Sequence, residues 1–114
     1  MIFQVEPKIT KNDITAVSDY MSSGGWLTEH KQTQKFEEEI SSFVTRKYAI
    51  SVPNGTIAIY LSLLSLGVKK GDKIAVPNIT MIATINAIIW TGATPVLIDV
   101  DDDLCMSLDH LKKN

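Results

Sequence analysis

A short turn between two apolar segments carries the residue types best suited to bind an anion. The apolar segment Tyr48–Val52 is followed by Pro53-Asn54-Gly55-Thr56, and an apolar helix is expected to begin at once. The first N–H groups of a helix have no intrahelical acceptor and lie at the positive end of the helix dipole. Gly55 would let a ligand approach the main chain, and Thr56 adds a hydroxyl group. The pattern is typical of a phosphate site, although an ordinary helix cap is the simpler explanation of these residues taken alone.

A second turn of the same kind, Pro77-Asn78-Ile79-Thr80-Met81, follows the next apolar segment. Ligands of open α/β sheets bind at the carboxyl ends of the strands, so the two turns could share one anionic ligand. Met81 would direct its polarizable thioether toward that ligand or would fill the core. Asp99 ends a further apolar segment at the same edge, where it could accept a hydrogen bond from a ligand or simply terminate the strand.

The remaining reactive side chains do not indicate a second site. His30 and His110 lie far apart in the sequence and outside any metal-ligand spacing, so we predict exposed, non-catalytic histidines. Cys105 has no visible base partner and is predicted to be an inert thiol. The run of glutamates at 37–39 is predicted to be the solvated face of a helix. No metal site is expected.

Apolar periodicity predicts two helices before these turns. Thr10 and Asp13 form a capping-box pair in front of the first helix, which is expected to end in the Ser22–Gly25 segment. The second helix is expected at 31–44, with Phe36 and Ile40 on its apolar face.

Beyond residue 47 the pattern changes to strands that alternate with helices. The helix at 56–66 is apolar nearly all round and is predicted to be buried, and Thr80 is the expected N-cap of the next helix. Strands are expected at 48–52, 73–76 and 95–100, helices at 56–66 and 81–90, and a last helix after a Ser107 cap. This alternation predicts an α/β fold with a parallel βαβαβ core, preceded by the two N-terminal helices.

Composition limits the classes of function. The 114 residues suffice for one domain, and 45% hydrophobic with 21% charged residues is a globular balance. A net charge of −2 argues against a nucleic-acid partner. The single cysteine and the lack of a signal peptide at Met1–Ile9 predict a cytoplasmic protein. The apolar stretch Ile79–Val100 contains polar residues and helix breakers, so we interpret it as a helix followed by a strand and expect no membrane span.

Six motifs in this order resemble the N-terminal portion of the DegT/DnrJ/EryC1/StrS family of aminotransferases, over nearly the whole chain. They are Ser23-Gly24-Gly25-Trp26-Leu27-Thr28, Lys35-Phe36-Glu37, Val52-Pro53-Asn54-Gly55-Thr56, Leu66-Gly67-Val68-Lys69-Lys70-Gly71-Asp72, the run from Val76 to Thr84, and the run from Gly92 to Asp101. Residues 1–114 would then be part of the large domain of a fold type I transferase that depends on pyridoxal 5'-phosphate.

The resemblance implies roles for particular residues. Gly55 and Thr56 would hold the cofactor phosphate, and Met81 stands where the family has an aromatic side chain stacked on the pyridine ring. Trp26 and Thr28 fall in a loop that resembles the family's substrate-side loop. The implied reaction transfers an amino group, from glutamate, to a nucleotide-linked keto-sugar, in a homodimer.

The same resemblance leaves part of the chemistry outside the 114 residues. The cofactor needs a Schiff-base lysine and a carboxylate opposite its pyridine nitrogen, and neither family motif is found here. Lys69, Lys70, Lys73, Lys112 and Lys113 are predicted to be surface residues. We therefore expect the chain alone to be inactive. Three alternatives stay open: a non-catalytic phosphate-binding, cofactor-binding or dimerisation module, a sugar dehydratase with the same cofactor, and a non-functional remnant.

Overall fold

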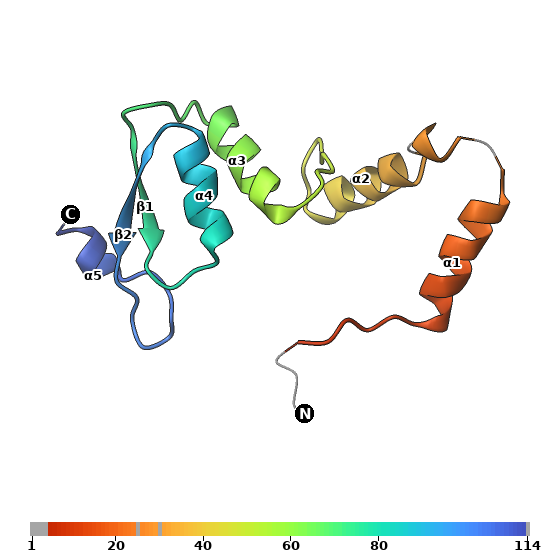
Figure 1. Ribbon diagram of the computed structural model, residues 1–114, viewed down its shortest axis with the longest axis horizontal. Coiled ribbons are helices and arrows are strands. Elements are labelled where there is room, and N and C mark those ends of the chain that lie inside the picture. Colours follow the sequence, from red (N-terminus) through yellow and green to blue (C-terminus); the bar gives the residue numbers. More distant parts are fainter. Residues whose placement is uncertain (1–4, 25, 30, 114) are drawn as a thin grey trace. The chain divides into compact units, whose positions relative to one another are not determined.

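The computed structural model describes residues 5–24, 26–29 and 31–113, which form two compact units, Met1–Ile50 and Ser51–Asn114 (Figure 1). The units are described separately. The first holds α1 (Lys11–Ser22), the short 3-10 helix η1 (Leu27–Glu29) and α2 (Lys31–Phe43). The second holds α3 (Gly55–Ser65), β1 (Lys73–Pro77), α4 (Ile82–Trp90), β2 (Thr94–Ile98) and α5 (Leu108–Leu111). The chain is therefore an α/β protein, as predicted.

The predicted capping box starts α1. The Thr10 N–H donates to Asp13 Oδ2 at 2.6 Å, and the Asp13 N–H donates to Thr10 Oγ1 at 3.4 Å. The Thr10 hydroxyl also donates to Asp13 Oδ2, at 2.7 Å. These hydrogen bonds favour the charged carboxylate and lower the pKa of Asp13 below its ordinary value. Two backbone donors that the start of a helix leaves without partners are satisfied in this way.

The apolar faces of the first unit are largely exposed. Ile14 and Val17 on α1 are 60% and 64% exposed, and Phe36 and Phe43 on α2 are 56% and 86% exposed. No residue of α1 or α2 is buried. Amphipathic helices of this kind normally bury such a face against other elements. The amphipathic pattern predicted both helices, but the described residues do not cover their apolar faces.

The second unit is built on a parallel pair of strands joined by a helix. The register runs from Lys73↔Thr94 to Pro77↔Ile98, and α4 makes the crossover between the strands. Figure 1 shows α4 lying along the β1–β2 pair. Val76, Ile88 and Ala93 form the centre of a small core. This part confirms the predicted parallel crossover.

α3 lies within one residue of the predicted helix at 56–66 but is less buried than expected. Asn54 caps its start, and Gly67, with φ +81°, follows its end in the left-handed conformation that favours glycine. The helix packs against α4, where Tyr60 meets Trp90 edge to face with the ring centroids 6.0 Å apart. None of its residues is buried. The expectation of a buried helix was wrong: α3 packs mainly against α4, and its residues stay partly or fully exposed.

The segment at 48–52, predicted to be a strand, is not a strand in the structure. A strand needs a neighbour that accepts and donates its backbone hydrogen bonds, and the sheet described here has the order β1-β2 with no third strand. Tyr48 and Ile50 are accordingly 73% and 81% exposed. The described core is thus βαβ, with one strand fewer than predicted.

The start of α4 also differs from the prediction. Its N-cap is Met81, without a side-chain hydrogen bond, whereas the Thr80 hydroxyl lies 3.0 Å from the Thr84 hydroxyl. The helix begins one residue later than expected, so Thr80 falls outside the cap position. None of the helices among the described residues is long and apolar enough to cross a bilayer.

Candidate functional site

The N-terminus of α3 presents two backbone donors that are not used within the fold. Asn54 Oδ1 accepts from the Ile57 N–H at 3.0 Å, and the Asn54 carbonyl accepts from the Ala58 N–H at 3.1 Å. The N–H groups of Gly55 and Thr56 have no hydrogen-bond partner among the described residues. Asn54 thus satisfies the inner amides of the first turn and leaves the outer two for water or a ligand.

The fold itself does not require a glycine at position 55. A Cβ atom built on Gly55 would meet no atom within 4 Å, and its φ lies outside the left-handed region. Any L-residue would therefore fit the described chain at this position. The missing side chain instead leaves room beside the free N–H groups, which is the space that a phosphate group needs at a helix N-terminus. These residues fit the phosphate of the predicted cofactor.

The second predicted turn lies at the carboxyl ends of the strands. Met81 stands directly before α4 with 75% of its surface exposed, so it does not fill the core. Figure 1 shows that α3 and α4 both begin on the side toward which the β1 and β2 arrows point. The structure therefore brings Gly55, Thr56 and Met81 to one edge of the second unit, where ligands of α/β sheets bind.

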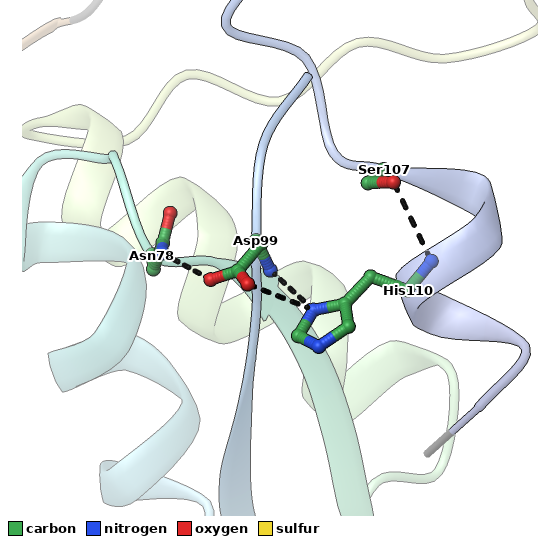
Figure 2. Close-up of polar contacts among 4 residues, drawn as sticks. All are labelled: Asn78, Asp99, Ser107 and His110. Carbon is green, nitrogen blue, oxygen red and sulfur yellow. Dashed lines mark hydrogen bonds and ion pairs between the residues drawn. The ribbon is translucent and has the colours of Figure 1, made fainter.

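A polar cluster joins β1, β2 and α5 at the same edge (Figure 2). The Asn78 side-chain amide donates to Asp99 Oδ1 at 2.7 Å. The Asp99 N–H donates to His110 Nδ1 at 2.9 Å, and that nitrogen lies 3.4 Å from Asp99 Oδ2. Ser107 caps α5 by accepting from the His110 N–H at 3.4 Å. The sequence indicated Asp99 at this edge and the Ser107 cap, but it did not indicate that Asn78 and His110 are partners of Asp99.

The prediction of an isolated, exposed His110 was wrong. The side chain is 38% exposed and accepts a main-chain hydrogen bond, because α5 returns to the end of β2. The Ser107 N–H, which donates to the Asp99 carbonyl at 2.8 Å, fixes this return. His30, the other histidine, lies outside the described residues.

The structure supports the prediction of an unreactive Cys105. The thiol is exposed, and the neighbouring Asp103 carboxylate raises its pKa, with a smaller contribution from Asp101. A raised pKa leaves less thiolate, which is the nucleophilic form. No cluster of three or more potential metal-ligating side chains occurs among the described residues.

The predicted substrate-side residues belong to the first unit. Trp26 is 78% exposed, and Thr28 lies in η1. The Tyr20 hydroxyl donates to the Leu27 carbonyl at 3.3 Å and so attaches η1 to α1. Their role toward a substrate stays a prediction.

The lysines considered for catalysis are exposed, as predicted: Lys69, Lys70, Lys73, Lys112 and Lys113.

The fold and this edge define an α/β protein whose helix N-termini open beside the carboxyl ends of parallel strands. Residues 7–114 match the DegT/DnrJ/EryC1/StrS aminotransferase family, and the chain belongs to that family.

The chain is also similar to individual proteins of known name or structure. The chain is 38% identical over 98 residues to GDP-perosamine synthase of Escherichia coli O157:H7, covering 86% of this chain and 27% of the relative. It is also 38% identical over 106 residues to the spore coat polysaccharide biosynthesis protein SpsC of Bacillus subtilis strain 168, and this match covers 93% of this chain and 27% of SpsC. A solved structure of the sugar aminotransferase Spr1654 from Streptococcus pneumoniae, in its pyridoxal phosphate (PLP) form, superimposes on the chain with a TM-score of 0.84 and 33% identity. The match covers 94% of this chain and 27% of Spr1654.

The chain spans about a quarter of the length of each of these three relatives. Spr1654 has also been solved in a PMP-form, so the structural relative carries the cofactor in two states. The matched residues include both predicted turns, the one before α3 and the one before α4.

Proposed function

We propose that residues 1–114 form the N-terminal, phosphate-binding part of the large domain of a pyridoxal-phosphate-dependent sugar aminotransferase. The observation that carries the proposal is the N-terminus of α3, where two unused N–H groups lie beside a glycine that the fold does not require. Family membership supports the cofactor, since the structural relative is a PLP-form. The name of one relative, GDP-perosamine synthase, supports a nucleotide-linked sugar as substrate.

In this proposal each side chain of the edge has a binding or orienting role. The N–H groups of Gly55 and Thr56 and the Thr56 hydroxyl hold the phosphate, where the α3 dipole favours a dianion. Met81 covers one face of the ring with its thioether. The bound cofactor supplies an electron sink for the carbanion at the amino-bearing carbon. The described residues orient the cofactor, and the groups that move protons are proposed to lie elsewhere.

We place the cofactor-binding lysine and the carboxylate opposite the pyridine nitrogen in the part of the relatives that this chain does not match. The large exposed apolar side chains of α1 and α2 support an assembly in which further protein covers them, and we propose the homodimer implied by the resemblance. The amino donor is proposed to be glutamate. An exposed free cysteine fits the reducing conditions of the cytoplasm, which stays our predicted location.

The experiment that tests the proposal is calorimetric titration of the 114-residue chain and its Gly55→Ala variant with pyridoxal phosphate. The added methyl group meets no atom of the protein, so the free energy of unfolding should stay the same or rise by less than about 1 kcal/mol. The methyl group would occupy the space beside the free N–H groups, so the affinity for pyridoxal phosphate should fall about tenfold or more. Pyridoxal without its phosphate is the control ligand and should respond little to the substitution.

Two outcomes would contradict the proposal. One is that the wild-type chain shows no binding of pyridoxal phosphate at millimolar concentration. The other is that Gly55→Ala binds it as tightly as the wild-type chain does. For the aminotransferase reaction itself, a longer protein containing this sequence should release 2-oxoglutarate from glutamate when a keto-sugar nucleotide is supplied. Loss of water from the sugar without consumption of glutamate would favour the dehydratase alternative.

A further inference from the structure

Asp99 is the point at which three segments of the second unit are joined. Its carboxylate accepts from Asn78 at the end of β1, at 2.7 Å. Its main chain is bonded by α5 and its cap: the Ser107 N–H donates to the Asp99 carbonyl at 2.8 Å, and the Asp99 N–H donates to His110 Nδ1 at 2.9 Å. Asp99 is therefore held from the α5 side and in turn holds Asn78 (Figure 2).

The pairing of Asn78 with Asp99 follows from the strand register. The last pair of the sheet is Pro77↔Ile98, and the Asn78 N–H donates to the Ile98 carbonyl at 2.9 Å, which continues the ladder by one residue. Asn78 and Asp99 are thus the next residues of two parallel strands, and their side chains meet one position beyond the last pair of the sheet. A charge-assisted hydrogen bond at this point fixes the direction in which the chain leaves β1.

The chain that leaves β1 at this point leads directly to Met81. Two residues, Ile79 and Thr80, lie between Asn78 and the N-cap of α4, and that N-cap has no side-chain hydrogen bond of its own. The Thr80–Thr84 hydroxyl contact at 3.0 Å lies on the helix side of the turn. Among the described residues, the Asn78–Asp99 hydrogen bond is the side-chain interaction that holds the turn at its strand end.

We propose that Asp99 is a positioning residue, which holds the turn Asn78–Met81 through Asn78 so that Met81 meets the ring of the bound cofactor. The inference rests on the proposed function, in which Gly55 and Thr56 hold the phosphate and Met81 contacts the ring. The two turns belong to different loops, so a change at Asp99 should affect contact with the ring while the grip on the phosphate is retained.

The test compares two ligands on the 114-residue chain, pyridoxal phosphate and inorganic phosphate, with three variants. Asp99→Ala removes the acceptor, whereas Asp99→Asn keeps an oxygen that can accept from Asn78. Asn78→Ala removes the bridge but leaves Asp99 with its bonds to Ser107 and His110, so it still reports on the turn if Asp99→Ala fails to fold. Amide hydrogen exchange at positions 78 and 84, measured without any ligand, reports on the two ends of the turn, because these N–H groups donate to the Ile98 and Met81 carbonyls.

We expect Asp99→Ala and Asn78→Ala to weaken pyridoxal phosphate binding about fivefold and to leave inorganic phosphate binding within twofold of the wild type. Exchange at positions 78 and 84 should accelerate by a similar factor, and Asp99→Asn should restore both properties. Equal losses for the two ligands, or no loss for either, would overturn the inference and leave the proposed function standing. If the wild-type chain binds pyridoxal phosphate no better than inorganic phosphate, the proposed function fails, and the inference fails with it.

Discussion

Gly55 and Thr56 illustrate how a small number of atoms can define a binding site. Asn54 satisfies the Ile57 and Ala58 amides, and the two amides before them stay available at the positive end of α3. A side chain at position 55 would cost the fold nothing. The absence of one is therefore better explained by the space a ligand needs than by the needs of the backbone.

Met81 is the residue of this edge whose substitution should improve binding. An aromatic ring covers a pyridine face with a larger and flatter surface than a thioether does. Because Met81 is 75% exposed, a larger side chain can be accommodated without disturbing the core. Met81→Phe should tighten pyridoxal phosphate binding several-fold, by about 0.5–1.5 kcal/mol, and leave inorganic phosphate binding unchanged in parallel titrations. Weaker binding of pyridoxal phosphate would contradict the assigned contact.

Asp13 gives α1 a dependence on pH. Its pKa lies below the ordinary value of 3.8 in the folded state, because Thr10 donates to its carboxylate. A group with a lowered folded pKa contributes stability above its unfolded pKa and loses that contribution as pH falls through the folded value. The helical circular dichroism signal of α1, followed in a peptide spanning residues 5–24, should decline below about pH 4. An Asp13→Asn peptide should show no such decline, and equal pH profiles would contradict the assignment.

α3 and α4 are each followed by a glycine, and substituting these two glycines should cost the fold different amounts of free energy. Gly67 and Gly92 both adopt left-handed φ values, +81° and +82°. A Cβ at Gly67 meets open space, whereas a Cβ at Gly92 would lie 3.1 Å from Lys70 Cβ. Gly67→Ala should lower the free energy of unfolding by about 1–2 kcal/mol. Gly92→Ala should lower it further, because it adds crowding to the same backbone strain.

Urea unfolding of the two glycine variants measures the difference between their free energies of unfolding. Amide hydrogen exchange in α3 and α4 is a second, independent measurement of the same difference. The wild-type chain in the same buffer is the reference. Equal losses of stability in Gly67→Ala and Gly92→Ala would show that Lys70 moves aside freely, and a smaller loss in Gly92→Ala would contradict the structure.

Local sequence signals predicted most elements because their causes are local. The Thr10–Asp13 capping box, the Asn-Gly turn before α3 and the Ser107 cap are all formed by residues within a few positions of each other. The strand at 48–52 was predicted from apolar character alone, and it was wrong because a strand depends on a partner from elsewhere.

The same distinction applies to the candidate site. Gly55, Thr56 and Met81 could be chosen from the sequence because each follows an apolar segment at a turn. The bond between Asn78 and Asp99 spans 21 positions and depends on the strand register. The contact of His110 with Asp99 depends on the return of the chain through Ser107. Neither has a local signal, so both required the fold.

At the scale of the molecule, the described residues bury very few side chains. Among the described residues, the buried hydrophobic side chains all lie in the second unit: Val76, Ala87, Ile88, Ala93 and Ile98. Many large apolar side chains are exposed, including Phe43 at 86% and Leu66 at 80%. A chain with so small a core should show weak cooperativity or should associate with itself.

Sedimentation velocity between 5 and 200 µM, combined with thermal unfolding, tests this expectation. We expect the average sedimentation coefficient to rise with concentration, or the melting transition to be broad. A monomer at every concentration with a sharp two-state transition would contradict it.

The most direct test of the central claim is a ¹H–¹⁵N NMR titration of the 114-residue chain with pyridoxal phosphate. The account predicts that the largest shifts of amide signals occur at Gly55 and Thr56, that Ile57 and Ala58 shift less because Asn54 already engages them, and that inorganic phosphate reproduces the Gly55 and Thr56 shifts. Saturable binding that leaves the Gly55 and Thr56 signals in place while other amides shift would contradict it.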